Sequence, residues 1–373
     1  MLTALFAAVA AAFGPVALES AASPFAPPPQ PVPKELRLLA PSGAFNAKML
    51  RAFERESGYV VAYDAYGDPA RIPSLMKEPY DVVVLPGPAL AHAIGARQLR
   101  PIEKAEVQNA RRIAPPVAGK LASYDATGGY GLAWGWSATG LLYDSGKVPR
   151  LLGAAPNSWA DALAPDVARR LARCGVALPD SRDEMFIAAW RMMGVDPTRV
   201  RERDVKAAAD LIIRARAAVR QPASHDPISA IAGGAVCLTF GDAAQAAIAT
   251  RRSREGGQGS EILFAEPREG GPIAIDALAE PRDAPHPKEA LALIDFLLRP
   301  SVDAEATAAA GLSSAEAETP TLNFRGLWPV GVYYPALVPV IEAEWARVRA
   351  PQQPAHPAQA SAASKPSKSR RKR

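Results

Sequence analysis

Three isolated carboxylates between residues 184 and 276 are the groups best placed to do chemistry. Glu184, Asp242 and Asp276 each follow an apolar segment. A carboxylate just past a buried strand or at a helix start tends to face a cleft. The three residues therefore predict a cleft that carboxylates line.

The pattern of histidines and glycines argues against an enzyme. His92, His225, His286 and His356 occur singly, without the spacing of a metal-binding pair. The chain contains no G-x-S-x-G, Walker A or G-x-G-x-x-G sequence. We therefore expect no catalytic residue, no metal site and no cofactor.

The positive charge of the chain is concentrated at its C-terminus. The formal net charge is +5, and six Lys or Arg residues lie in the last nine positions, so the remainder carries −1. The folded body is therefore not expected to bind nucleic acid. Residues 351–373 have low complexity and are predicted to form a disordered basic tail. A polyanion-binding role for this tail stays open.

The N-terminus has the features of an export signal. The run from Leu2 to Leu18 is apolar and small residues follow it, which predicts a signal peptide over residues 1–23. Residues 24–34 are rich in proline and predict a linker. A buried helix is the alternative for the apolar run. No other segment is long and apolar enough to span a membrane.

The chain contains two cysteines, Cys174 and Cys237, which lie 63 positions apart. Export would place both in an oxidising compartment, where they can pair. Two buried free thiols are the alternative.

The elements that position these residues follow an α/β pattern. Strands are predicted at 36–40, 59–63 and 81–85, and a helix that Ser42 caps runs to Gly58. Helices alternate with strands in the rest of the chain, as in open doubly wound sheets. Further elements are expected at 130–143 (a strand pair), 158–163 (helix), 174–178 (strand), 183–193 (helix), 207–219 (helix), 237–240 (strand), 273–279 (strand) and 288–298 (helix).

The order of these pieces resembles the periplasmic solute-binding proteins of ABC importers, and most closely the putrescine/spermidine-binding family. The resemblance covers residues 35–349. It implies an α/β fold of the two-lobe periplasmic-binding-protein kind (type II), in which each lobe is a mixed sheet flanked by helices and a hinge joins the lobes. The segments that carry it are 53–66, 80–90, 130–148, 173–186, 235–246, 269–281, 290–302 and 344–349.

The family fold implies that both lobes are discontinuous in sequence. We expect residues 35–134 and 247–296 in the first lobe, and residues 135–246 and 297–349 in the second. The resemblance also implies that Cys174 and Cys237 form a disulfide.

Members of the resembled family bind the ammonium groups of a diamine with carboxylates and enclose its methylene chain between aromatic rings. Glu184 and Asp276 match ligand carboxylates, and Trp328 matches an aromatic wall that is usually Tyr. Helix caps or solvated carboxylates are the alternative for Glu184 and Asp276, and ordinary packing is the alternative for Trp328.

Three further ligand positions lie in segments that depart from the family's pattern. Ser42 remains from an aromatic-Ser-Asp-aromatic motif, Asp242 replaces a wall Trp, and Gln245 replaces a ligand Asp. Asp242 has the alternative of capping the helix that follows it. These differences favour a smaller or more polar cation over a long polyamine.

The resemblance implies a periplasmic receptor of an ABC transporter that captures a small cationic, polyamine-like solute. Its partners would be the permease subunits, and we expect a monomer. The alternative is a sensory or scaffold subunit with the same fold and a degenerate cleft.

Overall fold

The computed structural model describes residues 34–219, 226–316 and 323–350. The predicted signal peptide (1–23), residues 24–33 of the predicted linker and the predicted basic tail (351–373) lie outside these residues. Lys34, the last residue of the predicted linker, already belongs to the first strand.

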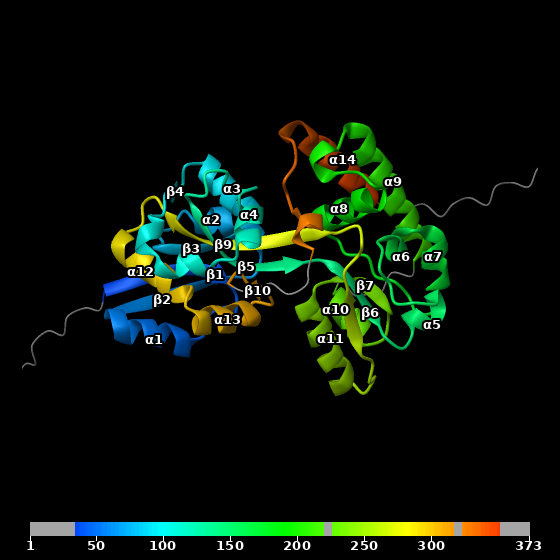
Figure 1. The fold of residues 1–373 in the computed structure, drawn as a ribbon, viewed down its shortest axis with the longest axis horizontal. Helices are drawn as coiled ribbons and strands as arrows, with labels where there is room; N and C mark the ends of the chain where they lie inside the picture. Colours follow the sequence, from blue (N-terminus) through cyan, green and yellow to red (C-terminus); the bar gives the residue numbers. More distant parts are fainter. Residues whose placement is uncertain (1–33, 220–225, 317–322, 351–373) are drawn as a thin grey trace, which may run out of the picture.

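The chain forms two lobes that lie side by side (Figure 1). The first lobe is built on an eight-stranded mixed sheet. The strands of this sheet are β1 (Lys34–Pro41), β2 (Tyr59–Tyr66), β3 (Val82–Pro86), β4 (Leu99–Arg100), β5 (Gly131–Ala138), β9 (Pro272–Pro281), β10 (Ser313–Ser314) and β11 (Trp328–Pro329).

The order of the large sheet is β10-β5-β9-β3-β1-β2, and β4 and β11 pair with β9. β1, β2 and β3 run parallel, and β9 runs antiparallel to β3 and β5. Helices cover both faces of this sheet, so its central strand β3 is apolar along its length and buried from Val82 to Leu85. The helical elements of the first lobe are α1 (Ala47–Ser57), η1 (Pro69–Arg71), α2 (Ile72–Leu75), α3 (Gly87–Gly95), η2 (Lys104–Glu106), η3 (Gln108–Arg112), α4 (Pro115–Leu121), α12 (Pro287–Leu297) and α13 (Pro300–Ala309).

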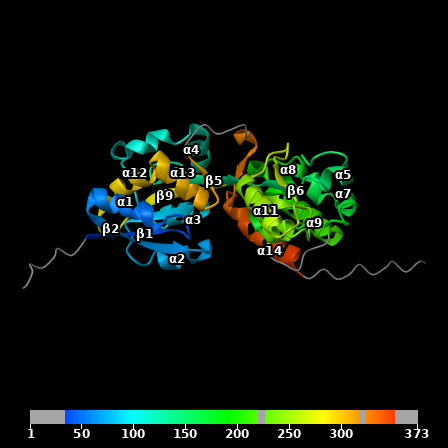
Figure 2. The ribbon, with the colours of Figure 1, turned by 90° about the horizontal axis from the view of Figure 1, so that it is seen from below.

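Alternation along β1 divides the apolar side chains of the first lobe between two cores. Leu36 and Leu38 are fully buried in the cluster that includes α1, α12 and α13. Leu39 points to the opposite face and packs in the cluster that includes α2, α3 and α4. Figure 2 shows α2 on one side of the strands and α12 and α13 on the other.

Asn46, and not Ser42, caps helix α1. The Asn46 side chain accepts hydrogen bonds from the backbone N–H groups of Lys48 and Met49. The predicted cap at Ser42 is therefore wrong, because four residues of turn separate Ser42 from the helix. Gly58 ends α1 as expected, and its φ of +74° is the left-handed conformation that glycine adopts without strain.

The second lobe has a smaller, three-stranded antiparallel sheet in the order β7-β6-β8. Trp159, Phe186 and Trp190 are fully buried in its main core. The elements of the second lobe are β6 (Gly140–Asp144), α5 (Val148–Leu152), α6 (Ala160–Leu163), α7 (Pro165–Arg170), α8 (Arg182–Met192), η4 (Pro197–Arg199), α9 (Glu202–Ala218), α10 (Pro227–Ala232), β7 (Leu238–Gly241), α11 (Ala243–Glu255), β8 (Ile262–Ala265) and α14 (Val338–Arg349).

The chain crosses between the lobes at three places. The predicted strand pair at 130–143 consists of β5 and β6, but these strands belong to different sheets and Thr139 lies between them. The second crossing leads from β8 into β9. The third leads from β10 towards α14 and contains η5 (Phe324–Gly326), β11 and η6 (Pro335–Leu337).

The packing differs from the expected lobe boundaries in two segments. α11 and β8 pack with the small sheet of the second lobe. Most of α11 and all of β8 belong to residues 247–296, which were expected in the first lobe. α13 and β10 fall in the 297–349 segment expected in the second lobe, but they pack on the large sheet. The chain thus returns to the first lobe at β9 and remains there through β10.

The predicted strand at 174–178 is not formed as a strand. Val176 makes only an isolated parallel bridge to Leu238 of β7. The disulfide between Cys174 and Cys237 is present, with a Cα–Cα distance of 5.4 Å, and it ties the segment after α7 to the start of β7. It lies entirely within the second lobe.

We expect removal of this disulfide to destabilise the second lobe. A crosslink that closes a loop of 63 residues reduces the entropy of the unfolded chain, which corresponds to about 4 kcal/mol of unfolding free energy. Denaturant titration with and without reductant measures the loss, and the double variant Cys174→Ala/Cys237→Ala should match the reduced protein. Two alkylatable thiols in the native, non-reduced protein would contradict the pairing.

Candidate functional site

Asp276 lies at the edge of the large sheet where the parallel strands end. It is opposite Pro86, the last residue of β3, and opposite Gly135 of β5. β1 ends at the same edge, and Ser42 follows it with an exposed side chain and a backbone N–H that donates to the Tyr66 carbonyl at 2.8 Å. This edge is where open α/β sheets bind ligands.

The carboxylate of Asp276 has no hydrogen bond or ion pair within the described residues. Part of its surface remains accessible, but the surrounding protein removes most of its hydration. This desolvation raises the pKa of Asp276 to about 7. Burial raises the pKa of Tyr66 and Tyr124, and the charge of Asp276 raises both further, so both phenols lie near this carboxylate.

Glu184 lies in the first turn of α8, in the second lobe. The Thr139 hydroxyl, which sits on the crossing between β5 and β6, donates to Glu184 Oε1 at 2.6 Å. Asp183 precedes Glu184 and accepts from Arg182 Nε at 2.7 Å. Both carboxylates are at a helix N-terminus, where the partial positive charge of the helix favours an anion. They line an open cavity of about 550 Å³.

This cavity reaches from the second lobe to β9 of the first lobe, although Asp276 itself is not among the residues that line it. Ala274 of β9 lines the cavity with Glu184, and Asp276 is two residues further along β9, so its side chain points to the same face as Ala274. The charges of Asp183 and Asp276 both raise the pKa of Tyr124, after the larger effect of burial. Asp183 of the second lobe and Asp276 of the first therefore both lie near Tyr124.

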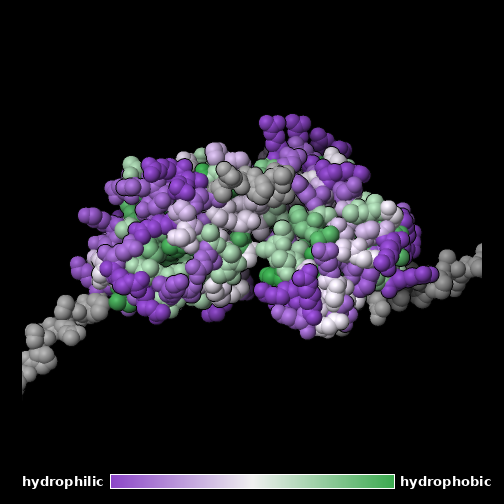
Figure 3. Space-filling view, turned by 60° about the horizontal axis from the view of Figure 1, so that its bottom comes forward, coloured by the Kyte–Doolittle hydropathy of each residue, from purple (hydrophilic) through white to green (hydrophobic). Residues whose placement is uncertain are grey.

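The third crossing lies beside this space. The Tyr124 hydroxyl donates to the Val330 carbonyl at 2.6 Å. A Cβ atom on Gly331 would lie 2.9 Å from Pro88 Cγ of the first lobe and 3.5 Å from Asp183 Oδ2 of the second, and its φ is +74°. Only a glycine lets the chain pass between the lobes here without displacing a neighbour. In Figure 3 the molecule narrows between the lobes, and apolar surface borders the constriction on the second lobe.

Asp242 and Gln245 form the N-terminal cap of α11. The Asp242 side chain accepts from the Gln245 backbone N–H at 2.8 Å, and the Gln245 side chain accepts from the Asp242 N–H at 3.0 Å. Burial raises the pKa of Asp242, and the charge of Glu184 adds to the effect. Asp242 also lines a small cavity of about 40 Å³ with Trp136 and Ser313 of the first lobe.

Trp328 is surrounded by protein cations. Lys120 Nζ is 5.7 Å and Arg191 Cζ is 5.9 Å from the centre of its ring. The Lys120 ammonium also donates to the Leu327 carbonyl at 2.5 Å. The positive charges of Lys120 and Arg191 would repel a cationic ligand at this ring. Trp328 is also absent from the lining of the cavity that contains Glu184.

The structure places Ser42 and Asp276 at one edge of the large sheet and Asp242 near Glu184. Asp183, beside Glu184, and Asp276 both lie near Tyr124. Sequence reasoning missed Asp183, Thr139, Tyr66 and Tyr124. Asp183 had a signal in its position beside Glu184 at a predicted helix start. Thr139, Tyr66 and Tyr124 had no such signal in the sequence, because the site residues near them come from distant parts of the chain.

Within the described ranges, no group of acidic, histidine or cysteine side chains is arranged to hold a metal ion. None of the helices in the same residues is long and apolar enough to cross a bilayer. The fold and the site define a two-lobe binding protein with a negatively charged interlobe space.

Comparison with known proteins gives the family. Residues 77–325 match the family described as bacterial extracellular solute-binding protein. The putrescine/agmatine-binding protein of Pseudomonas aeruginosa is 30% identical over 257 residues, which cover 68% of this chain and 70% of that protein. The putrescine-binding periplasmic protein PotF of Escherichia coli is 28% identical over 291 residues, covering 76% of this chain and 79% of the relative. The chain belongs to this family of solute-binding proteins, which are not enzymes.

Solved structures show the same fold. The spermidine/putrescine ABC transporter substrate-binding protein PotD of Streptococcus pneumoniae superposes with a TM-score of 0.72 at 13% identity, covering 84% of this chain and 98% of that one. The Tp0655 (TpPotD) lipoprotein of Treponema pallidum gives a TM-score of 0.68 at 20% identity, covering 85% and 99%. The predicted two-lobe α/β fold is confirmed.

The raised pKa of Asp276 predicts a pH-dependent cost to stability. Between its ordinary value and about 7, the folded protein holds a proton that the unfolded chain has lost. The unfolding free energy therefore falls as pH rises through this window. We expect Asp276→Asn to raise the unfolding free energy, and this gain to grow by on the order of 2 kcal/mol from pH 5 to pH 8.

Asp125→Asn is the matched control of opposite sign. Asp125 accepts from Thr127 Oγ1 and from the backbone N–H groups of Tyr130 and Gly131, and these hydrogen bonds lower its pKa despite burial. Its replacement should destabilise the protein more at pH 8 than at low pH. Denaturant titrations of both variants at the two pH values check this, and an Asp276→Asn gain that is independent of pH would contradict the desolvation argument.

Proposed function

We propose that the protein is the receptor of an ABC importer and captures a small cation carrying two positive charges, of the diamine class, between its lobes. The relatives in Pseudomonas aeruginosa and Escherichia coli are a putrescine/agmatine-binding and a putrescine-binding protein, which supports this ligand class. The observation that carries the proposal is Asp276. A desolvated carboxylate without a partner is costly for the fold, and a ligand cation would compensate that cost.

Two separated sets of carboxylates suit a ligand with two charges. Asp276 provides one set on the first lobe, and Glu184 with Asp183 provides the other on the second. A dication that contacts both sets would favour lobe closure, because it interacts more strongly with the closed state than with the open one. Tyr66 and Tyr124 lie near Asp276 and are buried, so they contribute to the poor hydration of this carboxylate.

The departures from the resembled family favour a short or polar ligand. Gln245 is engaged in the helix cap, so its amide is less available to a ligand. Trp328 contacts Lys120 and Arg191 and is less suited to enclose a methylene chain. Asp242 adds a carboxylate near Glu184 and supports an ammonium or guanidinium group at this end.

Export and partners follow from the same proposal. The mature protein would begin after the predicted signal peptide (1–23), act outside the cytoplasm as a monomer, and present its closed form to the permease subunits. The alternative is a sensory or scaffold subunit with an inactive cleft. Failure of the protein to bind any amine would favour this alternative.

We expect Glu184→Gln and Asp276→Asn each to weaken binding of a diamine such as putrescine by at least about tenfold, because each leaves an ammonium group without its charged acceptor. Isothermal titration at pH 8 measures the affinities. Glu202→Gln is the matched control, since Glu202 also occupies the first turn of a helix in the second lobe but is exposed, pairs with Lys206 and does not line the cavity. Unchanged affinity in both cleft variants, or binding of neutral sugars instead of amines, would rule out the proposed cleft chemistry.

Binding should release protons near neutral pH. Asp276, with a pKa of about 7, is partly protonated in the free protein, and a bound cation favours its ionised form. Affinity should therefore rise by up to about a hundredfold from pH 5 to pH 8. Titrations at pH 7 in buffers of different ionisation enthalpy quantify the released protons. Asp276→Asn should abolish this release, and persistent release in that variant would assign the titrating group elsewhere.

N-terminal sequencing of exported protein tests the localisation. We expect the mature chain to begin within residues 21–27, because small residues cluster there. A retained Met1 in a cytoplasmic pool would contradict export and remove the oxidising environment that the disulfide requires.

A further inference from the structure

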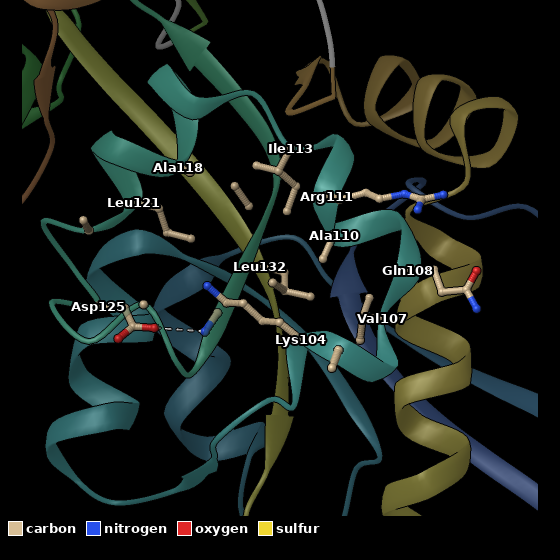
Figure 4. A pocket seen from close by; sticks show the side chains of 15 residues that line it. Lys104, Val107, Gln108, Ala110, Arg111, Ile113, Ala118, Leu121, Asp125 and Leu132 are labelled. Carbon is tan, nitrogen blue, oxygen red and sulfur yellow. Dashed lines mark hydrogen bonds between the residues drawn. The ribbon is translucent and has the colours of Figure 1, made fainter.

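A second cavity lies in the first lobe, separate from the carboxylates of the interlobe space. Its volume is about 450 Å³, within the range of roughly 300–1,000 Å³ that is usual for small-molecule sites. It is enclosed by η2, η3, α4 and the start of β5 (Figure 4). None of its lining residues also lines the cavity that contains Glu184.

The sheet explains why this space exists. β10 pairs with β5 only at Trp136 and Gly135, so the first residues of β5 have no neighbouring strand on that side. Residues 104–113 and helix α4 lie over these first residues of β5 in place of a strand. Many of the side chains that line the space are too small to fill it, and the small ones are Ala105, Ala110, Ala118, Ala122, Gly128, Gly131 and Ala133.

The floor of the cavity is apolar. Val107, Ile113, Leu121 and Leu132 contribute aliphatic side chains, and Figure 4 shows Ile113 and Leu132 on opposite sides of the central space. These side chains extend the apolar cores of the first lobe towards the opening. A ligand that fills the space must therefore present an aliphatic part to it.

One cation reaches across the cavity. In Figure 4 the side chain of Lys104 extends over the space towards Asp125, whereas Arg111 and Gln108 point away from its centre. Within the described residues, Lys104 has no ion pair or hydrogen bond through its ammonium group. The Lys104 charge is therefore available to an anion at the opening.

Asp125 does not offer an equivalent site for a cation. Its carboxylate already accepts hydrogen bonds from Thr127, Tyr130 and Gly131, which hold it against the wall of the cavity. Asp125 is buried, whereas Lys104 is exposed. The charge that an incoming ligand meets first is thus positive, opposite in sign to the charge of the interlobe space.

We infer that this cavity binds a small amphipathic anion, an aliphatic chain with a carboxylate head, whose head pairs with Lys104 and whose chain packs on Val107, Ile113 and Leu132. This function does not depend on the ligand of the interlobe space, because the two sites share no residue and differ in charge.

The probe is octanoate, with octanol and octylamine as neutral and cationic controls of the same chain length. Isothermal titration of the mature protein should give saturable binding of one octanoate, and weaker binding of both controls. Lys104→Gln should weaken octanoate binding by about fivefold, as expected for a partly exposed charge pair. Lys48→Gln is its matched control, since Lys48 is exposed on α1 and far from the cavity in the fold.

Filling the cavity provides an independent readout. Ala118→Leu places a larger side chain over the floor from the exposed side of α4 and should abolish octanoate binding, while Ala207→Leu on the exposed face of α9 should not. Melting curves of both variants confirm that they are folded. Asp276→Asn should leave octanoate binding unchanged.

Four outcomes would overturn the inference. Binding of octanoate that does not saturate, or that survives both Lys104→Gln and Ala118→Leu, excludes this cavity as the site. Equal binding of octanol excludes the role of Lys104. Loss of octanoate binding in Asp276→Asn would move the site to the interlobe space, and loss of diamine binding alone in that variant would leave this inference intact.

Discussion

The site depends on one desolvated carboxylate. Asp276 lies on β9, the strand that pairs with both β3 and β5 in the large sheet and continues towards the second lobe. Because β9 is central, the Asp276 side chain cannot move to bulk water without disrupting the sheet. Its charge therefore remains in a place where hydration is poor and where no cation of the described residues compensates it. A fold retains such a group at a cost to its stability, and that cost is informative about function.

The second lobe meets this carboxylate with a helix N-terminus. α8 presents Asp183 and Glu184 in its first turn, and the Thr139 hydroxyl orients Glu184 from the crossing between the two sheets. The third crossing, at Gly331, passes closely between Pro88 and Asp183. The segments that connect the lobes therefore also position the charged side chains. A change in the angle between the lobes would move Asp183 and Glu184 relative to Asp276, so the charge arrangement and the hinge are mechanically coupled.

Sequence reasoning predicted what depends on local pattern and failed where distant segments decide. The local pattern placed Glu184 at a helix start and Asp276 on a strand, as the structure has them, while their role in binding stays a prediction. The cap at Ser42 was wrong because Asn46 lies nearer the helix and offers a better acceptor geometry. The exchange of α11, β8, α13 and β10 between lobes was missed, since each has the composition of a generic surface helix or short strand. Tyr124 gave no signal, because only the fold brings it to Asp276.

In the proposed site, repulsion between the carboxylates of opposite lobes favours the open state when no ligand is bound. If the lobes approached each other without a cation, Asp183 and Glu184 would approach Asp276 in a poorly hydrated space, and their repulsion would oppose closure. A bound dication reverses the sign of this interaction, because each carboxylate set then faces a positive charge. The free energy of closure thus changes with the ligand's charge more than with its shape. A monocation neutralises one set and leaves the other unpaired, so closure itself discriminates against ligands with a single charge.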